Sequence, residues 1–579
     1  MSIDTPRPWL ASYAPGVPHD IELPSGSLYD LLETSVAEYS DNVALEFFGT
    51  TTSYRDLGEQ VSRAAEGLRA LGVRPGDTVA IVLPNAPQHV VAFYAVLRLG
   101  AIVIEHNPLY TPRELRHQFE DHGAKVVIAW DKVVDTIQAF PADVAVTTIV
   151  SVDVTRSMPL VTRIALRLPI AKAREARNTL TTRVRGTIRW DSLLKSEPIA
   201  ADVERPTADD VAVIQYTSGT TGHPKGATLT HLNLNSNAAQ ARAWVPAIER
   251  GTSVVYAVLP MFHAYGLTLC LAFAMSMGSR LVLFPKFDPE LVLKVLRKHP
   301  PTFLPAVPPI YERLMAAAAA DKVSLAGIQI AISGAMPLAQ SLVEPWEKLT
   351  GGYLVEGYGL SETSPVLMAN PVADTRRAGT VGLPLPNTEA RVVDPENPSI
   401  DREAGEEGEL IVRGPQVFGG YWGKPDETEA VFVADPAGGA PWFRTGDIVT
   451  IDPDGFVRIV DRIKELIITG GFNVSPSEVE EALKAFPGVA DAAVVGLPST
   501  HSGEDVVAAV VLQPGTALDE SAIRAFAREN LTAYKVPRRV VAVGELPKSL
   551  IGKTLRRVVR ERLMAGTAPE TGTETGPKG

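Results

Sequence analysis

The feature that most constrains the fold is an alternation of helical and strand patterns in the first 130 residues. Three stretches have the periodicity of helices, and three continuous apolar runs between and after them are typical of strands buried on both faces. The helical stretches are residues 53–72, 88–100 and 111–123, and the apolar runs are residues 78–83, 101–105 and 124–130. Ser53, with Asp56 three positions later, is typical of a helix start. Because strands that alternate with helices form parallel sheets covered by those helices, we predict an α/β fold.

The length of the chain predicts more than one domain. At 579 residues the chain is longer than a domain built around a single hydrophobic core usually is. After residue 460 the pattern changes to a small α+β arrangement, which begins with the charged connector DRIKE. We therefore expect a large N-terminal domain at residues 1–460, a small C-terminal domain at 461–565 and a tail at 566–579. The tail lacks large apolar side chains, so we predict that it is disordered.

Composition narrows the class of partner and the compartment. Lys and Arg number 55 against 67 Asp and Glu, a net charge of −12, whereas nucleic-acid binding needs a basic face. We therefore expect no nucleic-acid partner. The single cysteine, Cys270, excludes an intrachain disulfide, and no Cys/His cluster is present for a structural zinc. The N-terminus lacks the basic-then-apolar pattern of a signal peptide, so a cytoplasmic protein is expected.

An apolar stretch at residues 251–279 has the length of a membrane span. Pro260, His263 and Gly266 interrupt it, with short apolar runs on both sides. We predict a buried strand, a loop and a buried helix here instead.

A basic segment covers residues 156–189. It holds nine Lys and Arg residues against one acid, Glu175, with apolar residues interleaved. One interpretation is a solvated surface excursion. The other is a basic amphipathic segment that lies on an anionic membrane, which would make the protein peripheral at the inner membrane surface.

The sharpest local signal is the loop YTSGTTGHPKG at residues 216–226, which follows an apolar strand. Glycines let a backbone wrap closely around an anion, hydroxyls donate hydrogen bonds and a lysine supplies charge. These residue types predict a phosphate-binding loop, although a flexible linker has a similar composition. The loop is not the common P-loop, because Lys225 is followed by Gly226 rather than by Ser or Thr.

The loop resembles the signature of the adenylate-forming superfamily, which includes acyl-CoA synthetases, firefly luciferase and peptide-synthetase adenylation domains. Eight further segments resemble motifs of that superfamily and occur in its order. They are LPMFHAYGL (259–267), SGAMPL (333–338), EGYGLSET (356–363), GTVGLP (379–384), ELIVRG (409–414), WFRTGD (442–447), DRIKELIITGGFNVSPSEVE (461–480) and PKSLIGK (547–553). Within the superfamily the chain is most similar to bacterial long-chain fatty acid–CoA ligases, through HNPLYTPREL (106–115), GGFNVSPSEVE (470–480) and the basic segment.

This resemblance implies both a fold and a reaction. The implied fold is a large N-terminal domain of parallel α/β sheets with a small β-barrel-like subdomain, followed by a small mobile α+β domain. The implied reaction uses ATP, Mg²⁺ and coenzyme A: a fatty acid attacks the α-phosphate of ATP, and the acyl group of the acyl-AMP then passes to coenzyme A. Three alternatives stay open: an acyl-AMP ligase that serves a separate carrier protein, an aryl or medium-chain acid–CoA ligase, and a non-catalytic acyl- or nucleotide-binding protein. A dimer is compatible with the resemblance.

The resemblance also implies roles for single residues. Lys553 would bridge the carboxylate and the α-phosphate during adenylation, and Glu362 would be the ligand of Mg²⁺. Lys464 would lie at the hinge about which the small domain rotates after adenylation. Asp447 would accept hydrogen bonds from the ribose hydroxyls, and Arg462 would contact the nucleotide.

Further positions would line the substrate sites. The phosphates of ATP would be held by Thr217, Ser218, Gly219, Thr220, Thr221 and Lys225, helped by Ser361, which stands where the superfamily usually has Thr. Adenine and the acyl tunnel would be surrounded by Gly334, Ala335, Glu356, Gly357 and Tyr358. The acyl site would be lined by His263, Tyr265 and Gly359, and coenzyme A would meet Gly470, Gly471 and Phe472.

Overall fold

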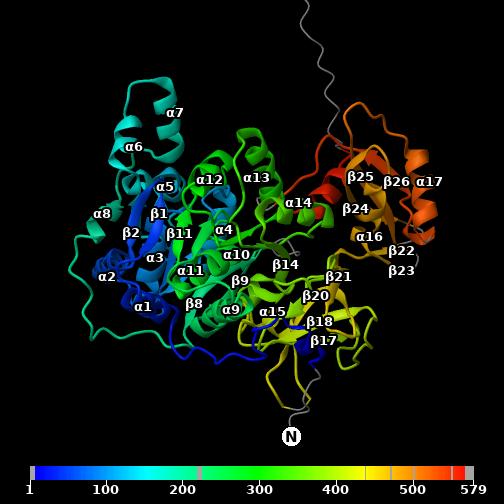
Figure 1. Cartoon of the computed structure of the whole chain (residues 1–579), viewed down its shortest axis with the longest axis horizontal. Coiled ribbons are helices and arrows are strands. Elements are labelled where there is room, and N and C mark those ends of the chain that lie inside the picture. Colours follow the sequence, from blue (N-terminus) through cyan, green and yellow to red (C-terminus); the bar gives the residue numbers. More distant parts are fainter. Residues whose placement is uncertain are drawn as a thin grey trace, which may run out of the picture. The chain divides into compact units, whose positions relative to one another are not determined.

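The computed structural model describes residues 7–217, 224–436, 438–469, 472–499, 503–531, 533–549 and 552–566. The chain divides into two compact units (Figure 1). The first unit consists of Met1–Ala390, Val412–Phe443 and Asp454–Phe456, and the second of Arg391–Ile411, Arg444–Pro453 and Val457–Gly579. The predicted boundary at residue 461 stays a prediction.

Two predominantly parallel sheets form the frame of the first unit. The nine-stranded sheet has the order β16-β15-β14-β13-β12-β10-β11-β1-β2, and the seven-stranded sheet has the order β7-β6-β5-β3-β4-β8-β9. The six strands from β14 to β1 pair in parallel, as do the six from β7 to β8. The predicted α/β fold with parallel sheets is therefore confirmed.

The strands of these sheets are short and mostly buried. Those of the nine-stranded sheet are β1 (Val43–Phe47), β2 (Thr50–Ser53), β10 (Val254–Ala257), β11 (Arg280–Leu283), β12 (Phe303–Ala306), β13 (Ile330–Ser333), β14 (Tyr353–Gly359), β15 (Val366–Ala369) and β16 (Leu383–Pro384). Those of the seven-stranded sheet are β3 (Thr78–Val82), β4 (Ile102–Glu105), β5 (Val126–Trp130), β6 (Thr148–Val152), β7 (Ile188–Arg189), β8 (Val211–Thr217) and β9 (Lys225–Thr230).

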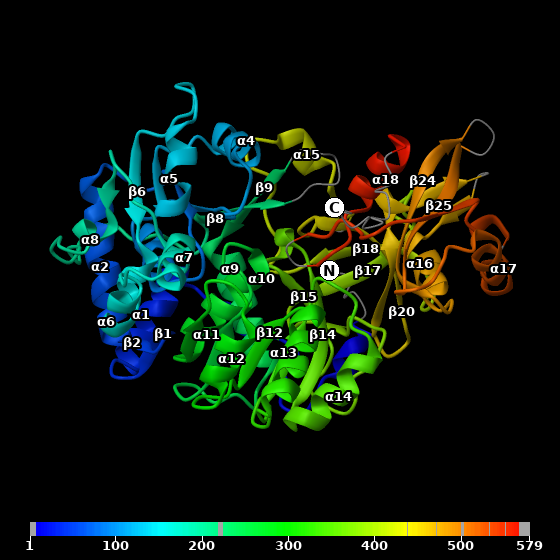
Figure 2. The same cartoon turned by 90° about the horizontal axis from the view of Figure 1, so that it is seen from above.

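Helices pack on these sheets and between them. Every residue of α3 is buried, and α3 contacts strands of both sheets, because its sequence offers no polar face to solvent. Helices α12, α13 and α14 lie side by side along the nine-stranded sheet (Figures 1 and 2). The helices of this unit are α1 (Leu28–Glu38), α2 (Tyr54–Ala70), α3 (Pro87–Arg98), α4 (Pro112–His122), α5 (Asp131–Gln138), α6 (Leu160–Ala165), α7 (Ala171–Leu180), α8 (Trp190–Leu193), α9 (His231–Trp244), α10 (Ala264–Gly266), α11 (Phe273–Met277), α12 (Pro289–Leu296), α13 (Pro308–Asp321), α14 (Gln340–Thr350) and α15 (Pro425–Glu429).

Short 3₁₀ turns and one π-helical stretch complete the first unit. The turns are η1 (Pro8–Ser12), η2 (Val154–Ser157) and η4 (Ser361–Thr363), and the π-helical stretch is η3 (Leu267–Ala272). Residues 251–279 form buried strand β10, a loop and the buried succession α10-η3-α11, as predicted. Among the helices that the structure describes, none is long and apolar enough to cross a membrane.

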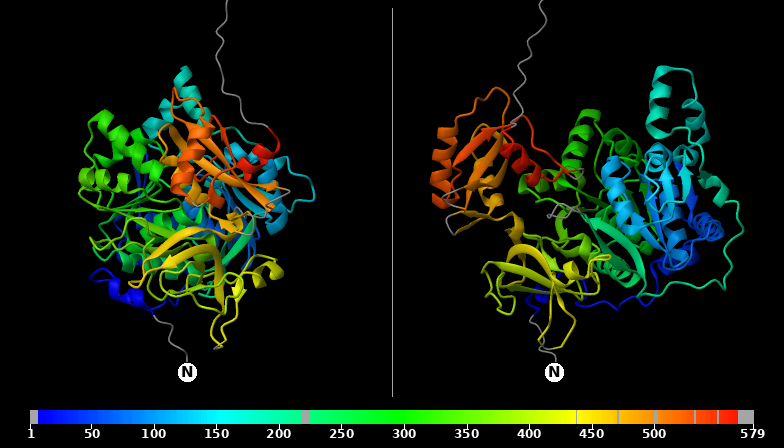
Figure 3. Two further views of the ribbon diagram at one scale, coloured as in Figure 1. Left: turned by 90° about the vertical axis from the view of Figure 1, so that its right-hand side faces the viewer. Right: turned by 180° about the vertical axis from the view of Figure 1, so that it is seen from behind.

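Helices α6 and α7 of the basic segment contain no buried residue. They project from the end of the unit that carries α5 and α8 (Figures 1 and 3). The base of α7 is held by hydrogen bonds to its carbonyls, from Trp130 Nε1 to Leu180 (2.8 Å) and from Lys132 Nζ to Asn178 (2.6 Å).

A third sheet has the order β17-β18-β20-β19, with β21 paired to β20. Its strands are β17 (Glu389–Val393), β18 (Gly408–Arg413), β19 (Phe432–Val433), β20 (Trp442–Ile451) and β21 (Val457–Arg462). The β-barrel-like character of a small subdomain stays a prediction.

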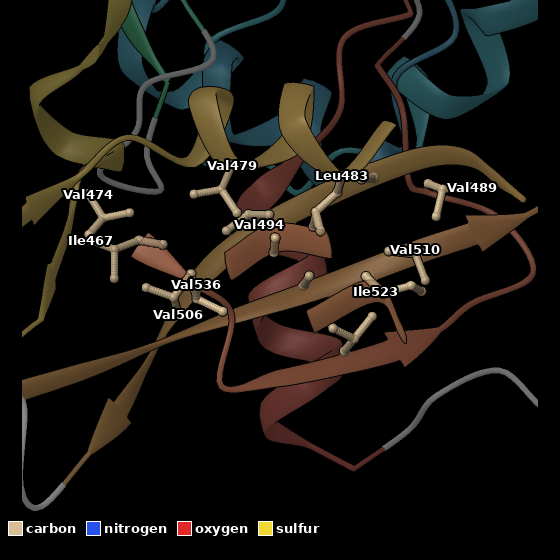
Figure 4. Close-up of a cluster of buried hydrophobic side chains, with 14 residues drawn as sticks. Ile467, Val474, Val479, Leu483, Val489, Val494, Val506, Val510, Ile523 and Val536 are labelled. Carbon is tan, nitrogen blue, oxygen red and sulfur yellow. The ribbon is translucent and has the colours of Figure 1, made fainter. Parts of the chain in front are cut away.

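The second unit contains a fourth sheet covered by helices. Its strand order is β23-β22-β25-β24, with β26 paired to β25. Valine, isoleucine and leucine side chains from the sheet and from α16 and α17 form its core (Figure 4). The elements are β22 (Ile467–Thr469), β23 (Phe472–Val474), β24 (Val489–Ser499), β25 (Gly503–Leu512), β26 (Arg539–Ala542), α16 (Pro476–Lys484), α17 (Glu520–Asn530), α18 (Arg556–Met564), η5 (Ile463–Glu465) and η6 (Ala533–Lys535). This arrangement confirms the expected smaller α+β part of the chain.

Candidate active site

The predicted phosphate loop joins the antiparallel strands β8 and β9. Thr217 and Lys225 are paired opposite each other at the ends of the two strands, so the two ends of the loop lie side by side. Ser218, Gly219, Thr220 and Thr221 lie outside the described residues. The hairpin is tightly packed behind the lysine, because a Cβ atom on Gly226 would lie 2.5 Å from Cγ2 of Ile214.

Lys225 has two neighbours that sequence analysis missed. Its ammonium forms an ion pair with Glu427 on α15 and lies 5.0 Å from the centre of the Tyr421 ring. The Tyr421 hydroxyl donates a 2.9 Å hydrogen bond to Oε1 of Glu362, the predicted Mg²⁺ ligand. The structure therefore brings the predicted lysine and the predicted carboxylate to the same tyrosine, the lysine to its ring and the carboxylate to its hydroxyl.

Glu362 belongs to the 3₁₀ turn η4, together with Ser361. Its carbonyl oxygen accepts a 2.8 Å hydrogen bond from the backbone of Phe418, which places Tyr421 within reach. Among the described residues, no group of three or more His, Cys, Asp or Glu side chains could hold a metal. A single carboxylate fits Mg²⁺, which usually takes one or two protein carboxylates and completes its shell with phosphates and water.

A second set of predicted residues lies where β13 and β14 end. Ser333 is paired with Glu356 in these parallel strands, so Gly334 and Ala335 follow β13 at the same edge of the sheet. Ligands of α/β sheets bind at the carboxyl ends of the strands. Ala335 has a φ of 64°, a left-handed conformation that turns the chain sharply at this edge.

Tyr265 fixes the neighbouring loop to the same edge. Its hydroxyl lies 2.7 Å from the Ile332 carbonyl oxygen and 3.2 Å from that of Ala306, and it can donate to either. A Cβ atom on Gly334 would lie 3.1 Å from the Tyr265 ring. Nδ1 of His263 accepts a 3.3 Å hydrogen bond from the backbone of Tyr265, and burial lowers the pKa of His263. His263 is therefore an acceptor that is neutral near pH 7.

The remaining predicted residues of this set lie along β14. Burial raises the pKa of the Glu356 carboxyl to about 8, partly opposed by a hydrogen bond from the backbone of Leu338. Gly357 and Tyr358 are paired with β15, and the chain then reaches Gly359. A Cβ atom on Gly359 would lie 1.7 Å from the carbonyl oxygen of Pro365, so only glycine fits there.

In the second unit, Asp447 and Arg462 lie opposite each other on β20 and β21. Nε of Arg462 is 3.0 Å from Oδ1 of the buried Asp447 carboxylate. An aspartate that is buried and still charge-paired keeps a carboxylate oxygen in a defined position, as ribose binding would require.

Lys553 lies in a turn of the second unit that Ser549 closes. The Ser549 amide donates to the Lys553 carbonyl (2.8 Å), and the Lys553 amide donates to Ser549 Oγ (3.1 Å). Burial lowers the pKa of the Lys553 ammonium, Arg462 lowers it further, and Glu465 and Asp447 partly oppose this. The three predicted residues Asp447, Arg462 and Lys553 thus act on one another electrostatically.

Arg556, three residues after Lys553, was not predicted. Its guanidinium contacts Glu480 (2.7 Å), Ser477 Oγ (2.6 Å) and the carboxylate of Glu465, with Asp461 at 3.6 Å. Arg556 thereby ties the start of α18 to the connector at residues 461–465, where Lys464 is the predicted hinge. Nothing in a single sequence indicates this pairing, since the partners are far apart along the chain.

The predicted contacts for coenzyme A are only partly visible. Gly470 and Gly471 lie outside the described residues. For Lys464 and Phe472 the structure describes the backbone alone, and Phe472 is paired with Thr469 in the hairpin of β22 and β23. Their roles stay predictions.

The two parallel α/β sheets, the loop hairpin with its lysine and the smaller α+β unit define an adenylate-forming type of enzyme. The chain belongs to the AMP-binding enzyme family, which it matches over residues 32–422, and it matches the AMP-binding enzyme C-terminal domain over residues 478–553.

Relatives match almost the whole chain. A long-chain-fatty-acid–CoA ligase of Bacillus subtilis is 38% identical over 96% of this chain and 98% of its own length. One of Escherichia coli O157:H7 is 37% identical over the same shares. Among solved structures, ATP-bound MatB from Rhodopseudomonas palustris has a TM-score of 0.79 and 31% identity, covering 94% of this chain and all of its own.

Proposed function

We propose that this chain is an ATP-dependent fatty acid–CoA ligase. In the first step a carboxylate oxygen attacks the α-phosphorus of ATP, and pyrophosphate leaves with the electrons of the broken P–O bond. In the second step the thiol of coenzyme A, losing its proton, attacks the acyl carbon, and AMP leaves. The activation is needed because a free carboxylate is a poor electrophile.

The observation that supports this function is two groups of charged side chains in a chain that resembles long-chain-fatty-acid–CoA ligases over 96% of its length. A lysine, a tyrosine and a carboxylate adjoin the loop hairpin, and an aspartate, an arginine and a lysine act together in the second unit. Positioned charge is the main catalytic requirement of phosphoryl chemistry.

In the first unit, the loop and Lys225 would hold the β- and γ-phosphates, with Ser361 near them. Glu362 would hold Mg²⁺, which supplies charge neutralisation to the phosphates when bound. Tyr421 keeps the Glu362 carboxylate oriented through its hydrogen bond. Gly334, Ala335 and the strand from Glu356 to Gly359 would border the adenine and acyl sites.

In the second unit, Asp447 would accept hydrogen bonds from the ribose, and Lys553 would neutralise charge on the carboxylate and the α-phosphate. The lowered pKa of Lys553 reflects a partly desolvated ammonium. Desolvation strengthens the attraction between such an ammonium and a phosphate once the phosphate is bound. Rotation about Lys464 would then bring the residues near Phe472 to coenzyme A.

One set of assays tests both which carboxylic acid is activated and whether coenzyme A accepts the acyl group. We expect pyrophosphate release to be fastest with straight-chain acids of about 12 to 18 carbons and to be followed by acyl-CoA formation. A rice 4-coumarate–CoA ligase is also 33% identical over 90% of this chain, so aromatic acids belong in the same panel. Faster release with aromatic or medium-chain acids would contradict the fatty-acid assignment. Acyl-AMP that accumulates without thioester would instead favour loading of a carrier protein.

We also propose that the basic segment contacts an anionic membrane. Leu160 and Val161 on α6 are 66% and 79% exposed, and Ile164 is 56% exposed. Within the part of the chain that the structure describes, Arg163 and Arg167 form no ion pair.

Two short helices without buried residues gain little from packing, and helices of this length are marginal in water. Exposed apolar side chains beside unpaired arginines suit the headgroup region of an anionic bilayer better than bulk water. Such contact would bring the enzyme to membrane-bound fatty acids. The expectation of a dimer stays a prediction that sedimentation analysis would measure.

A further inference from the structure

Lys225 has an acidic neighbour, Glu427, which would compete with the phosphates of ATP for the Lys225 ammonium. Glu427 lies on the five-residue helix α15, at its third position, and its carboxylate forms an ion pair with the Lys225 ammonium. The side chain of Lys225 is 16% exposed and that of Glu427 is 40% exposed. The lysine is therefore enclosed while the glutamate is open to solvent on one side.

We propose that Glu427 is a placeholder for the triphosphate: it holds Lys225 before ATP binds, and ATP must displace it. Glu427 would thereby set the affinity for ATP as a positioning residue. This inference rests on the proposed role of Lys225 in binding the β- and γ-phosphates.

The electrostatics favour displacement over coexistence. An ammonium that binds phosphate oxygens through its donors has fewer left for a carboxylate, and a carboxylate beside a triphosphate is repelled by its negative charge. Because Glu427 is partly exposed, its side chain can turn into solvent at a small energetic cost.

Tyr421 keeps the lysine in place during this exchange. Its ring centre lies 5.0 Å from the ammonium, a distance at which a cation is attracted to an aromatic face. The same tyrosine donates to Glu362. Lys225 can therefore release the Glu427 carboxylate and bind a phosphate of ATP while it stays close to Glu362, the proposed Mg²⁺ ligand.

The test measures ATP and AMP binding to the full chain by calorimetry, with Glu427→Gln compared to the wild type. Removing the competing charge should lower the Kd for ATP about fivefold, because ATP then no longer has to break the ion pair between Glu427 and Lys225. A partly exposed ion pair contributes a free energy of about this size. AMP binding should not change, because AMP lacks the two phosphates that Lys225 would hold. A matched control is Glu429→Gln, which removes the same charge from an exposed position of the same helix and should change neither affinity.

Equal ATP affinities for Glu427→Gln and the wild type would overturn the inference, as would an equal gain for ATP and AMP. Lys225→Met separates this outcome from a failure of the proposed function. If Lys225→Met weakens ATP binding while Glu427→Gln leaves it unchanged, the inference alone is wrong. If Lys225→Met binds ATP like the wild type, the phosphate role of Lys225 is wrong, and the inference falls with it. Combining the two substitutions should abolish the gain, because no cation then remains to compete for.

Discussion

The charge of Lys553 is the single feature on which adenylation depends most directly. Lys553→Ala removes the ammonium that would stabilise charge on the α-phosphate, so acid-dependent pyrophosphate release should fall about 10²- to 10³-fold. Formation of acyl-CoA from added acyl-AMP should change far less, since that step no longer needs this charge. A stopped-flow measurement of each half-reaction checks the split.

The matched control for Lys553→Ala is Lys548→Ala on the same turn. Lys548 is paired with Asp491 at 2.8 Å rather than with the nucleotide-site residues, so its loss should leave both half-reactions near the wild-type rate. Equal losses in both half-reactions for Lys553→Ala would contradict its assignment to adenylation.

Glu356 carries a pH-dependent contribution to stability. Burial raises its pKa from 4.5 to about 8, so the folded protein keeps this proton over a range in which the unfolded chain has lost it. Stability therefore falls as the pH rises from about 4.5 to about 8. Glu356→Gln cannot lose a proton, so its melting temperature should fall less over that range, and the two proteins should show parallel melting temperatures at the acidic end. Parallel curves across the whole range would contradict the raised pKa.

At the scale of elements, the hairpin of β8 and β9 is held by close packing at Gly226. A methyl group there would lie 2.5 Å from Cγ2 of Ile214, so the Ile214 side chain or one of the strands would have to shift. Gly226→Ala should therefore lower the free energy of unfolding by about 1–3 kcal/mol, as overpacking does, and should weaken ATP binding by moving Lys225. Urea denaturation and ATP titration measure the two effects.

Gly419→Ala is the control for this substitution, because a Cβ atom there meets nothing within 4 Å. Ile214→Ala in the Gly226→Ala background makes room for the added methyl group, so it should recover part of the ATP affinity. Full stability of Gly226→Ala would mean that the hairpin can relax and does not depend on this contact.

The elements that sequence predicted best are those with strong local signals. Ser53 caps α2, accepting a 3.1 Å hydrogen bond from the Asp56 amide, as its place before the helical pattern indicated. The apolar runs became the buried strands β3, β4 and β5. Helices α6 and α7 show the limit: their composition indicated amphipathic character, but only the structure shows that no residue of either is buried.

At the scale of the whole molecule, the basic segment predicts selective membrane binding. The protein should sediment with vesicles that contain an anionic phospholipid and much less with neutral ones, and salt should weaken binding by screening. Combined neutralisation of Arg163, Arg167 and Arg174 to Gln should reduce binding by about a hundredfold, since each basic residue contributes roughly 1 kcal/mol near such a surface.

A control variant neutralises Lys294, Arg297 and Lys298 to Gln, which changes the net charge equally on another part of the same unit. It should bind vesicles almost like the wild type. If both triple variants lose the same share of vesicle binding, then binding depends on the net charge of the protein and not on the basic segment. Unchanged binding after neutralising the segment would remove it from the membrane contact.

Sequence alone determined the architecture and the family resemblance. Helix caps, apolar runs and the ordered motifs are local signals, so each can be recognised without its neighbours in space. Residue types pointed to Lys225 as a phosphate ligand, and the family resemblance implied the roles of Glu362, Asp447 and Lys553.

Tertiary structure alone decided which groups surround those residues. Glu427 and Tyr421 beside Lys225, and Arg556 beside Glu480, come from segments distant in sequence, and a charged side chain gives no local sign of its partner. Tertiary structure also set the pKa values of two site residues. The raised pKa of Glu356 and the lowered pKa of Lys553 depend on desolvation, which only packing creates.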